Sequence, residues 1–194
     1  VVDGEVRRIK SIDVIPNPLA LNMYMLGYTS DGKLTRLNEA VKQNVKIYLS
    51  QYRVLTDAIN LKDAYIINVG VRFAITVKRG FNKNEVLFKA IQQVKKFFET
   101  KKWQINQPIV LSDIAYVIGL VDGVVTVVPP QDNNPNKNLV VIENKHKVAE
   151  GYSGNIYDTD AATRDGIVYT SLDPSIFEVK YPNVDIEGRV VGDR

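Results

Sequence analysis

The segment from Ile67 to Lys78 alternates strictly between apolar residues and polar or small ones over twelve positions. Successive side chains of a β-strand point to opposite faces, so this period of two predicts one long strand. We expect one face of the strand to be buried and the other to face water. The buried set should be Ile67, Val69, Val71, Phe73, Ile75 and Val77, and the exposed set Asn68, Gly70, Arg72, Ala74, Thr76 and Lys78.

Apolar residues at spacings of three and four predict a helix on either side of this strand. The first helix should begin near Lys33 or Thr35, with an apolar stripe of Leu34, Leu37, Val41, Val45, Tyr48 and Tyr52. The second should begin at Asn82, because an asparagine N-cap with Glu85 three residues on has the form of a capping box. Its stripe consists of Leu87, Ala90, Ile91, Val94 and Phe98.

Shorter elements complete the expected fold. Ser112 is a candidate N-cap for a short helix, and Asp122-Gly123 predicts a turn into a strand over residues 124–128. Further extended segments are expected at residues 6–14, 19–28, 55–61 and 139–142. The sequence therefore predicts an α+β fold: a mostly antiparallel sheet with two longer helices and one short helix packed on one face. An irregular, β-rich C-terminal extension should follow.

Changes of composition along the chain give the expected domain organisation. Residues 1–32 are expected to form a β-rich N-terminal segment. This segment should be truncated from a longer chain, because the sequence starts with Val-Val-Asp-Gly and has no initiator methionine. Residues 33–130 are expected to form the α+β core domain. After Pro129-Pro130 the chain becomes rich in Asp, Asn and Pro, so residues 131–194 are expected to form an extended β or irregular C-terminal arm.

Composition excludes several classes of function. The 194 residues include no cysteine, which excludes disulfides, thiolate metal sites and cysteine nucleophiles. No apolar run approaches the roughly 20 residues that a membrane-spanning helix needs, so no membrane partner is expected. The sequence has no P-loop, dinucleotide-binding, zinc-protease or serine-hydrolase motif. We therefore expect no small-molecule substrate and no cofactor.

Two features resemble sites of chemistry, and each has a simpler explanation. His146, the single histidine, stands in a polar stretch without a partner for acid–base or ligand duty. The cluster of Asp158, Asp160 and Asp165 opens like a calcium loop. However, Ala162 stands at the third ligand position and no glutamate closes the loop. Turn chemistry explains these aspartates, so we expect no metal.

Lysines gather on and beside the second predicted helix. The chain has 25 basic and 22 acidic side chains, and its net charge of +3 gives little long-range attraction to nucleic acid. The lysines fit the solvated face of a helix. They also fit an alternative function, a nucleic-acid-binding accessory domain, although the polar face of the long strand has no aromatic residues for base stacking. These lysines are Lys83, Lys89, Lys95, Lys96, Lys101 and Lys102.

Residues 145–194 carry spaced aromatic side chains and little helical periodicity. Two arrangements are open for them. They could pack as irregular β structure on their own domain and complete its core, or they could form an arm that lies on another subunit. For the second arrangement, the expected interface anchors are Tyr152, Tyr157, Tyr169, Phe177 and Tyr181.

Five blocks of the sequence and its ending follow one another in a characteristic order. The blocks are residues 37–53, 67–77, 85–98, 109–118 (with Leu111-Ser-Asp-Ile114) and 122–127, and the ending is residues 165–182. In this order they resemble the C-terminal part of the baseplate wedge subunits of T-even-type contractile-tailed bacteriophages, in the baseplate-J-like family. The resemblance covers roughly residues 35–182 and contains no catalytic signature.

The resemblance implies a structural role. Copies of such subunits pair with each other and with a neighbouring wedge protein, and the wedges join into a ring around a central hub. We therefore expect a non-enzymatic homo-oligomer, with a dimer as its expected form, together with other baseplate wedge proteins. Its expected location is the tail baseplate of a virion, assembled in the host cytoplasm. A third hypothesis, an enzyme fragment with catalytic residues in a missing N-terminal part, requires titratable residues that converge in one pocket.

Overall fold

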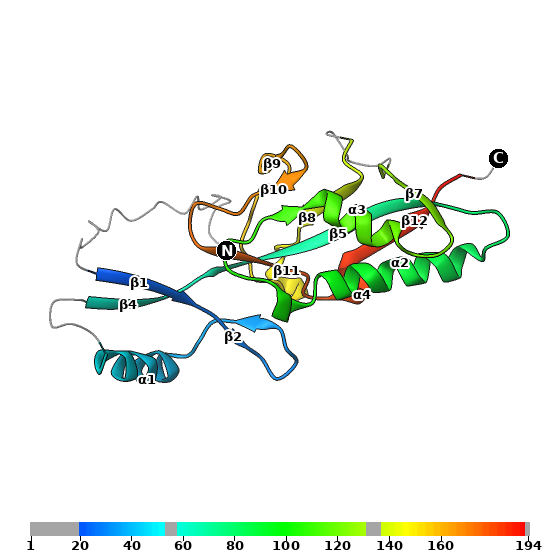
Figure 1. The fold of residues 1–194 in the computed structure, drawn as a ribbon. Helices are drawn as coiled ribbons and strands as arrows, with labels where there is room; N and C mark the ends of the chain where they lie inside the picture. Colours follow the sequence, from blue (N-terminus) through cyan, green and yellow to red (C-terminus); the bar gives the residue numbers. More distant parts are fainter. Residues whose placement is uncertain (1–19, 53–57, 131–136, 193–194) are drawn as a thin grey trace. The chain divides into compact units, whose positions relative to one another are not determined.

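A computed structural model describes residues 20–52, 58–130 and 137–192. It confirms the predicted fold class: the chain is α+β, and most of its strand pairs are antiparallel (Figure 1). The chain divides into two compact units. The smaller unit comprises Val1–Tyr24 and Asn38–Lys62, and the larger unit comprises Met25–Leu37 and Asp63–Arg194. The strand predicted at residues 6–14 lies outside the described residues, as do the first positions of the segment predicted at 55–61.

The larger unit is organised around β5 (Tyr65–Val77), which confirms the long strand predicted from the alternating sequence. Four strands pair with β5, and they are β7 (Val124–Val128), β8 (Val140–Asn144), β11 (Ser175–Glu178) and β12 (Ile186–Val190). The first two are antiparallel to β5 and the last two are parallel to it. Because Phe73 pairs with both Val140 and Gly188, β8 and β12 lie on opposite edges of β5.

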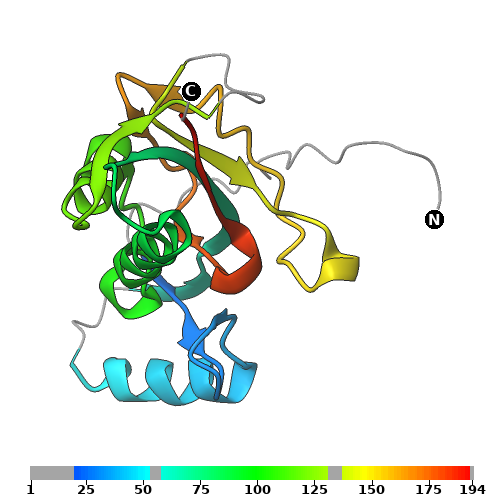
Figure 2. The ribbon, with the colours of Figure 1, turned by 90° about the vertical axis from the view of Figure 1, so that its right-hand side faces the viewer.

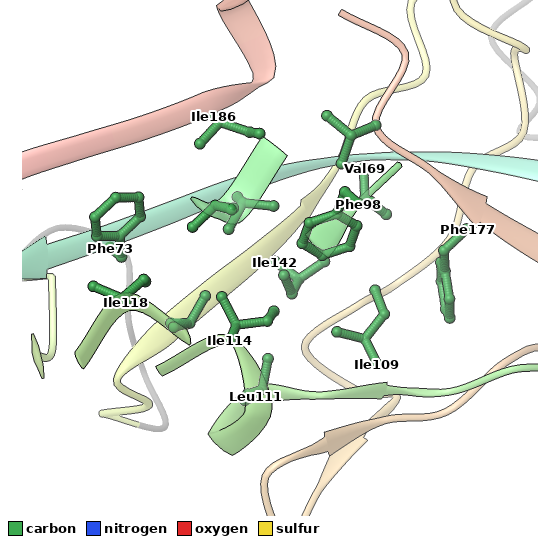
Figure 3. Close-up of a cluster of buried hydrophobic side chains, with 14 of the residues drawn as sticks. Val69, Phe73, Phe98, Ile109, Leu111, Ile114, Ile118, Ile142, Phe177 and Ile186 are labelled. Atoms are coloured by element: carbon green, nitrogen blue, oxygen red, sulfur yellow. The ribbon is translucent and has the colours of Figure 1, made fainter. Parts of the chain in front are cut away.

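Two helices, α2 (Lys83–Phe97) and α3 (Leu111–Gly119), lie side by side over the apolar face of β5 (Figures 1 and 2). Ile114 and Ile118 of α3 lie in one buried cluster with Val69 and Phe73 of β5 (Figure 3). After α2, the chain passes through η1 (Thr100–Lys102) and then places Trp103 under the end of the helix. The Trp103 ring stacks on Phe98, with ring centroids 5.3 Å apart.

The second face of β5 is also covered, which differs from the expectation that it faces water. Asn68 and Ala74 on this face are completely buried. The segment after β8 provides the cover. The Lys145 N–H donates to the Asn68 carbonyl, and a Cβ added at Gly70 would lie 2.5 Å from the Lys145 side chain and 3.2 Å from the main-chain oxygen of Asp185. The covering residues are far from β5 in the sequence, so the alternation by itself could not reveal them.

The C-terminal residues are part of the central sheet. Three of the four strands that pair with β5 come from residues 137–192: β8 is antiparallel to β5, and β11 and β12 are parallel to it. This differs from the predicted boundary between residues 130 and 131. The smaller elements of this region are β9 (Thr163–Arg164) and β10 (Ile167–Val168), which form a sheet with β6 (Ile109–Val110), together with η2 (Val148–Glu150) and α4 (Pro182–Asp185).

The N-terminal elements also differ from the predicted boundary at residues 32 and 33. β2 (Gly27–Tyr28) and β3 (Leu34–Thr35) form a hairpin in the larger unit, where Leu34 is buried. The first helix, α1 (Glu39–Ser50), therefore begins later than predicted, with the Asn38 side chain accepting the Val41 N–H at 2.8 Å. In the smaller unit, α1 accompanies a two-stranded sheet of β1 (Ala20–Met25) and β4 (Ala58–Asp63).

The start signals of the other two helices were only partly predictable. Asn82 caps α2 as predicted, and its side chain accepts the N–H groups of Asn84 and Glu85. The Glu85 carboxylate, however, binds Lys89 at 2.6 Å. The predicted N-cap at Ser112 is wrong: the N-cap is Val110, two residues earlier, and the Leu111 N–H donates to the Gly166 carbonyl.

Candidate interaction surfaces

The smaller unit exposes the apolar stripe of α1. None of the side chains in this helix is buried, and Val41, Tyr48 and Tyr52 are 39%, 60% and 71% exposed. The rings of Tyr48 and Tyr52 contact each other, with centroids 5.2 Å apart. Val45, on the same side of the helix, is half-buried. Apolar residues at helical spacing ordinarily face a core, so this stripe is a surface that a partner could cover.

A shallow cavity of about 250 Å³ lies beside the same helix. Ile47 and Ser50 of α1 and Ile59 of β4 contribute to its walls. Among the described residues that line it, Lys46 is the one ionisable residue. The cavity therefore extends the apolar character of the smaller unit and brings no acid–base pair together.

The five aromatic residues predicted as interface anchors have different environments. Phe177 and Tyr152 are 1% and 8% exposed, so they complete the core of their own chain, as the first of the two arrangements has it. Tyr157 and Tyr181 are half-buried, and the Tyr157 hydroxyl donates to the Tyr169 carbonyl at 2.6 Å. Tyr169 itself is 47% exposed, so its ring remains accessible to a partner.

A buried carboxylate joins three distant segments of the larger unit. Glu178 accepts the Leu34 N–H at 2.6 Å and the Asn68 side-chain amide at 2.7 Å, one on each oxygen. Asn68 in turn accepts the Ser153 N–H at 2.8 Å. Burial raises the pKa of the Glu178 carboxyl group, while the two hydrogen bonds and the charges of Lys180 and Lys33 oppose the rise.

A second buried carboxylate, Asp185, has the same character. Its two oxygens accept the Tyr152 hydroxyl and the Tyr181 N–H. Burial raises the pKa of the Tyr152 hydroxyl, and the hydrogen bond to Asp185 adds to the rise. Both carboxylates thus have their oxygens occupied by donors from their own chain. These contacts join segments far apart in the sequence, so the network holds the fold of the larger unit together.

The sequence features considered for metal or acid–base chemistry occupy turns and the surface. Asp158 accepts the Ala161 N–H, three residues on, through its side chain and so stabilises the local turn. Asp165 and Gly166 have positive φ angles of 53° and 75° and connect β9 to β10. His146 is exposed. Across residues 20–52, 58–130 and 137–192, no three His, Asp or Glu side chains are placed to hold a metal ion.

Several lysines on and after α2 already interact with acceptors of their own chain. Lys89 pairs with Glu85 at 2.6 Å and Lys102 pairs with Glu99 at 2.9 Å. Lys95 donates to the Asn183 side chain at 2.6 Å. These contacts reduce the positive potential that a phosphate backbone would meet on this helix.

A groove of about 360 Å³ opens on the larger unit between α2, η1 and α3. We call it the α2–α3 groove. Its walls combine aromatic and aliphatic side chains with the polar groups of glutamine and lysine. They include Gln93, Lys96, Phe97, Lys102, Trp103 and Val117. Such a mixture suits an apolar side chain that arrives with a negative charge beside it.

A third cavity, of about 250 Å³, is lined by Arg72, Pro130, Glu187 and Arg189. Arg72 forms an ion pair with Glu143, which is also 3.6 Å from Lys145. Charges of both signs alternate here, so the cavity selects no single charge of ligand.

Comparison with known proteins does not assign this chain to a family. None of the models of known protein families matches the sequence. No curated protein matches it with significance either. Among the residues that the structure describes, no helix combines the length and apolar character needed to cross a membrane.

Sequence reasoning missed the residues that organise these surfaces. Glu178 interrupts the apolar run Ile176-Phe177-Glu178-Val179, and a charged residue within such a run was the available signal for a buried polar contact. Leu172 stands within the turn-like sequence Ser171-Leu-Asp-Pro174, where an apolar residue has no obvious core to join.

Proposed function

We propose that this chain is a structural subunit of the tail baseplate of a contractile-tailed phage. In this role it is a wedge subunit that associates with copies of itself and with other wedge proteins in the ring around the central hub. The resemblance of its element order to T-even-type wedge subunits supports the proposal. The observation that carries it is the exposed apolar stripe of α1.

A twelve-residue helix is marginally stable alone and depends on packing of its apolar face. That face leaves Val41 39% exposed, and Tyr48 and Tyr52, the latter just past the end of α1, more than half exposed. Tyrosine is enriched at the centres of protein interfaces, where its ring is buried and its hydroxyl group can find a partner. Self-association would cover the stripe and stabilise the helix at the same time.

The buried carboxylates of the larger unit support a structural rather than a catalytic role. A general acid or base must reach a substrate proton, but Glu178 and Asp185 bind donors of their own chain on both oxygens. Glu178 ties the hairpin to β5, and Asp185 ties α4 to Tyr152. Such rigidity suits a subunit whose task is to hold a shape under mechanical load.

The nucleic-acid-binding alternative has weaker support, because Glu85 and Glu99 pair with two of the lysines on which it depends. It predicts that the chain retards single- or double-stranded nucleic acid at low salt, with an affinity that falls steeply as salt is added. We expect no retardation. Salt-sensitive binding would favour this alternative over the baseplate role.

The molar mass in solution tests self-association. Sedimentation equilibrium of the wild-type chain should give a dimer or a larger species at micromolar concentration. The variant Tyr48→Ser/Tyr52→Ser should sediment as a smaller species with an unchanged circular dichroism spectrum, because it removes the apolar surface and leaves the N-cap intact. The matched control Gln43→Ser/Asn44→Ser changes exposed residues outside the stripe and should behave as wild type. A wild-type monomer at all concentrations would overturn the self-association.

The phage assignment has its own test. Purified tail baseplates from the source of the sequence should yield tryptic peptides of this chain by mass spectrometry, in amounts that match the other wedge proteins. If the peptides appear only in the fraction without tails, the baseplate assignment is wrong.

A further inference from the structure

Leu172 is the most exposed large apolar side chain in the described chain, at essentially full exposure. It stands between β10 and β11, at the tip of a short loop that also exposes Asp173. Placing a leucine side chain wholly in water forgoes about 2 kcal/mol of burial. A side chain in this position is a candidate anchor for a partner.

The loop around Leu172 is held in shape by its own hydrogen bonds. The Ser171 hydroxyl bonds to the Asp173 carbonyl at 2.7 Å and lies 3.0 Å from the Ser175 hydroxyl. Pro174 follows and fixes its own φ angle. A loop that is ordered before binding loses little entropy when it docks, which favours its use as a binding element.

The base of this loop is joined to the wall of the α2–α3 groove. The Asn106 N–H donates to the Ser175 carbonyl at 2.7 Å, and the Asn106 side chain accepts the Ser175 N–H at 3.0 Å. The next residue, Gln107, lines the groove. Two hydrogen bonds and one step along the chain therefore connect the base of the Leu172 loop to the wall of the groove.

The two features are complementary in chemistry. The groove presents Phe97, Trp103 and Val117 to an apolar side chain, and Lys96 stands at its polar side, while Lys102 is paired with Glu99. The loop presents Leu172 followed directly by Asp173. A leucine with an adjacent carboxylate matches an apolar groove with an adjacent ammonium group.

We propose that a second copy of this chain binds the larger unit by placing its Leu172 in the α2–α3 groove, while its own groove receives Leu172 of the first copy. When a protrusion and a groove lie close together on one surface, a two-fold axis brings each onto its counterpart, which gives a closed, isologous contact. This inference rests on the proposed self-association, but it uses a surface different from the α1 stripe.

Cross-linking between two single-cysteine variants tests the contact directly, because the chain has no cysteine of its own. Leu172→Cys and Gln93→Cys are mixed, one of them carrying a mass tag, and treated with a short thiol-to-thiol cross-linker. The proposal expects a tagged–untagged heterodimer within minutes. The control mixture pairs Leu172→Cys with Val148→Cys, which is also exposed, at 70%, but lies outside the groove, and should give only background.

Affinity measurements on charge and truncation variants add a second readout. Leu172→Ser should raise the dissociation constant of the dimer about thirtyfold or more, with an unchanged circular dichroism spectrum, because the side chain is fully exposed in the described structure. Asp173→Lys should also weaken the dimer, and a second substitution, Lys96→Glu, should restore part of the affinity.

The outcomes separate this contact from the proposed function. If the wild type is a dimer but the groove mixture gives no more heterodimer than the control, the contact at Leu172 is wrong and the self-association stands. If the groove mixture cross-links while Tyr48→Ser/Tyr52→Ser keeps the wild-type mass, the contact at Leu172 stands and the role of the α1 stripe fails. A chain that is monomeric and does not cross-link would overturn both.

Discussion

At the scale of single residues, Glu178 shows how a charged side chain serves as framework. Its neighbours in sequence, Phe177 and Val179, are buried, and it is itself 3% exposed. A buried carboxylate is tolerated only when its oxygens are hydrogen-bonded. The donors that satisfy it belong to Leu34 and Asn68, which are 144 and 110 positions away. The sequence could show an unusual residue in a strand, but it could not show those donors.

Replacing Glu178 by glutamine tests this contact. Glutamine has a single side-chain carbonyl oxygen, so one of the two N–H donors would face an NH₂ group. We expect Glu178→Gln to lower the free energy of unfolding at pH 7 by about 1–3 kcal/mol. Urea denaturation measures the change. The control Glu187→Gln alters an exposed carboxylate on β12 and should stay within about 0.5 kcal/mol of wild type.

The same variant tests the raised pKa of Glu178. Because the folded state holds the proton more tightly than the unfolded state, the contribution of this carboxyl group to stability is largest at pH below its ordinary pKa of 4.5. That contribution falls as the pH rises from 4.5 through the raised value. The stability gap between wild type and Glu178→Gln should therefore shrink over this window. A gap that grows with pH would show that the pKa is lowered instead.

At the scale of secondary structure elements, the sequence predicted those that depend on local patterns and missed those that depend on distant partners. The alternation of residues 67–77, the stripe of α2 and the turn before β7 are all encoded within a few residues, and the structure confirms them. The predicted start of α1 was wrong because Leu34 pairs in a hairpin and its N–H donates to Glu178, so this residue is not part of the helix. The parallel strands β11 and β12 depend on partners far along the chain, for which a single sequence has no signal.

The same distinction applies to the interaction surfaces. The stripe of α1 was predicted as a pattern, but its exposure depends on what other segments leave uncovered. All five aromatic residues of the C-terminal region were predicted as interface anchors together, for the arrangement in which this region lies on another subunit. Packing against distant parts of the chain then buries Tyr152 and Phe177 and leaves Tyr169 accessible.

The N-cap of α2 should contribute more than the ion pair next to it. Asn82 satisfies two N–H groups of the first turn, whereas Glu85 and Lys89 are both solvent-exposed. We expect Asn82→Ala to cost about 1 kcal/mol of the free energy of unfolding. Glu85→Gln should have a clearly smaller effect, because a solvated ion pair is weakened by competition with water. Thermal denaturation of both variants compares the two, and an equal loss would show that Glu85 has a capping role after all.

The turn before β7 needs glycine for two reasons that can be separated. Gly123 has a φ of 95°, and an added Cβ would lie 2.7 Å from side-chain atoms of Phe81 and Val86. Gly80 has a similar φ of 90° but nothing within 4 Å. Gly80→Ala should therefore cost only the conformational strain, about 1–2 kcal/mol. Gly123→Ala should cost about 1–3 kcal/mol more because of overpacking. Equal losses in chemical denaturation would mean that Phe81 moves aside without cost.

At the scale of the whole molecule, the larger unit is closed by its own C-terminal residues. β5 pairs with β8, β11 and β12, and all three follow residue 136. Pairing of such distant segments makes folding depend on long-range contacts. Deletion of residues 145–194 would remove β11 and β12 and unfold the larger unit. A change in molar mass of such a variant would therefore not measure self-association.

A chain that ends at Pro130 should not form the larger unit. β5 would keep β7 as its single neighbour in the sheet, and its buried side chains and open edges would favour aggregation. We expect the near-ultraviolet circular dichroism signal of Trp103 and a cooperative urea transition to be lost. A separate polypeptide of residues 137–194, added during refolding, should restore both, because it supplies the three missing strands. Cooperative unfolding of the truncated chain by itself, with a denaturant dependence close to that of the full chain, would show that residues 137–194 are an appendage after all.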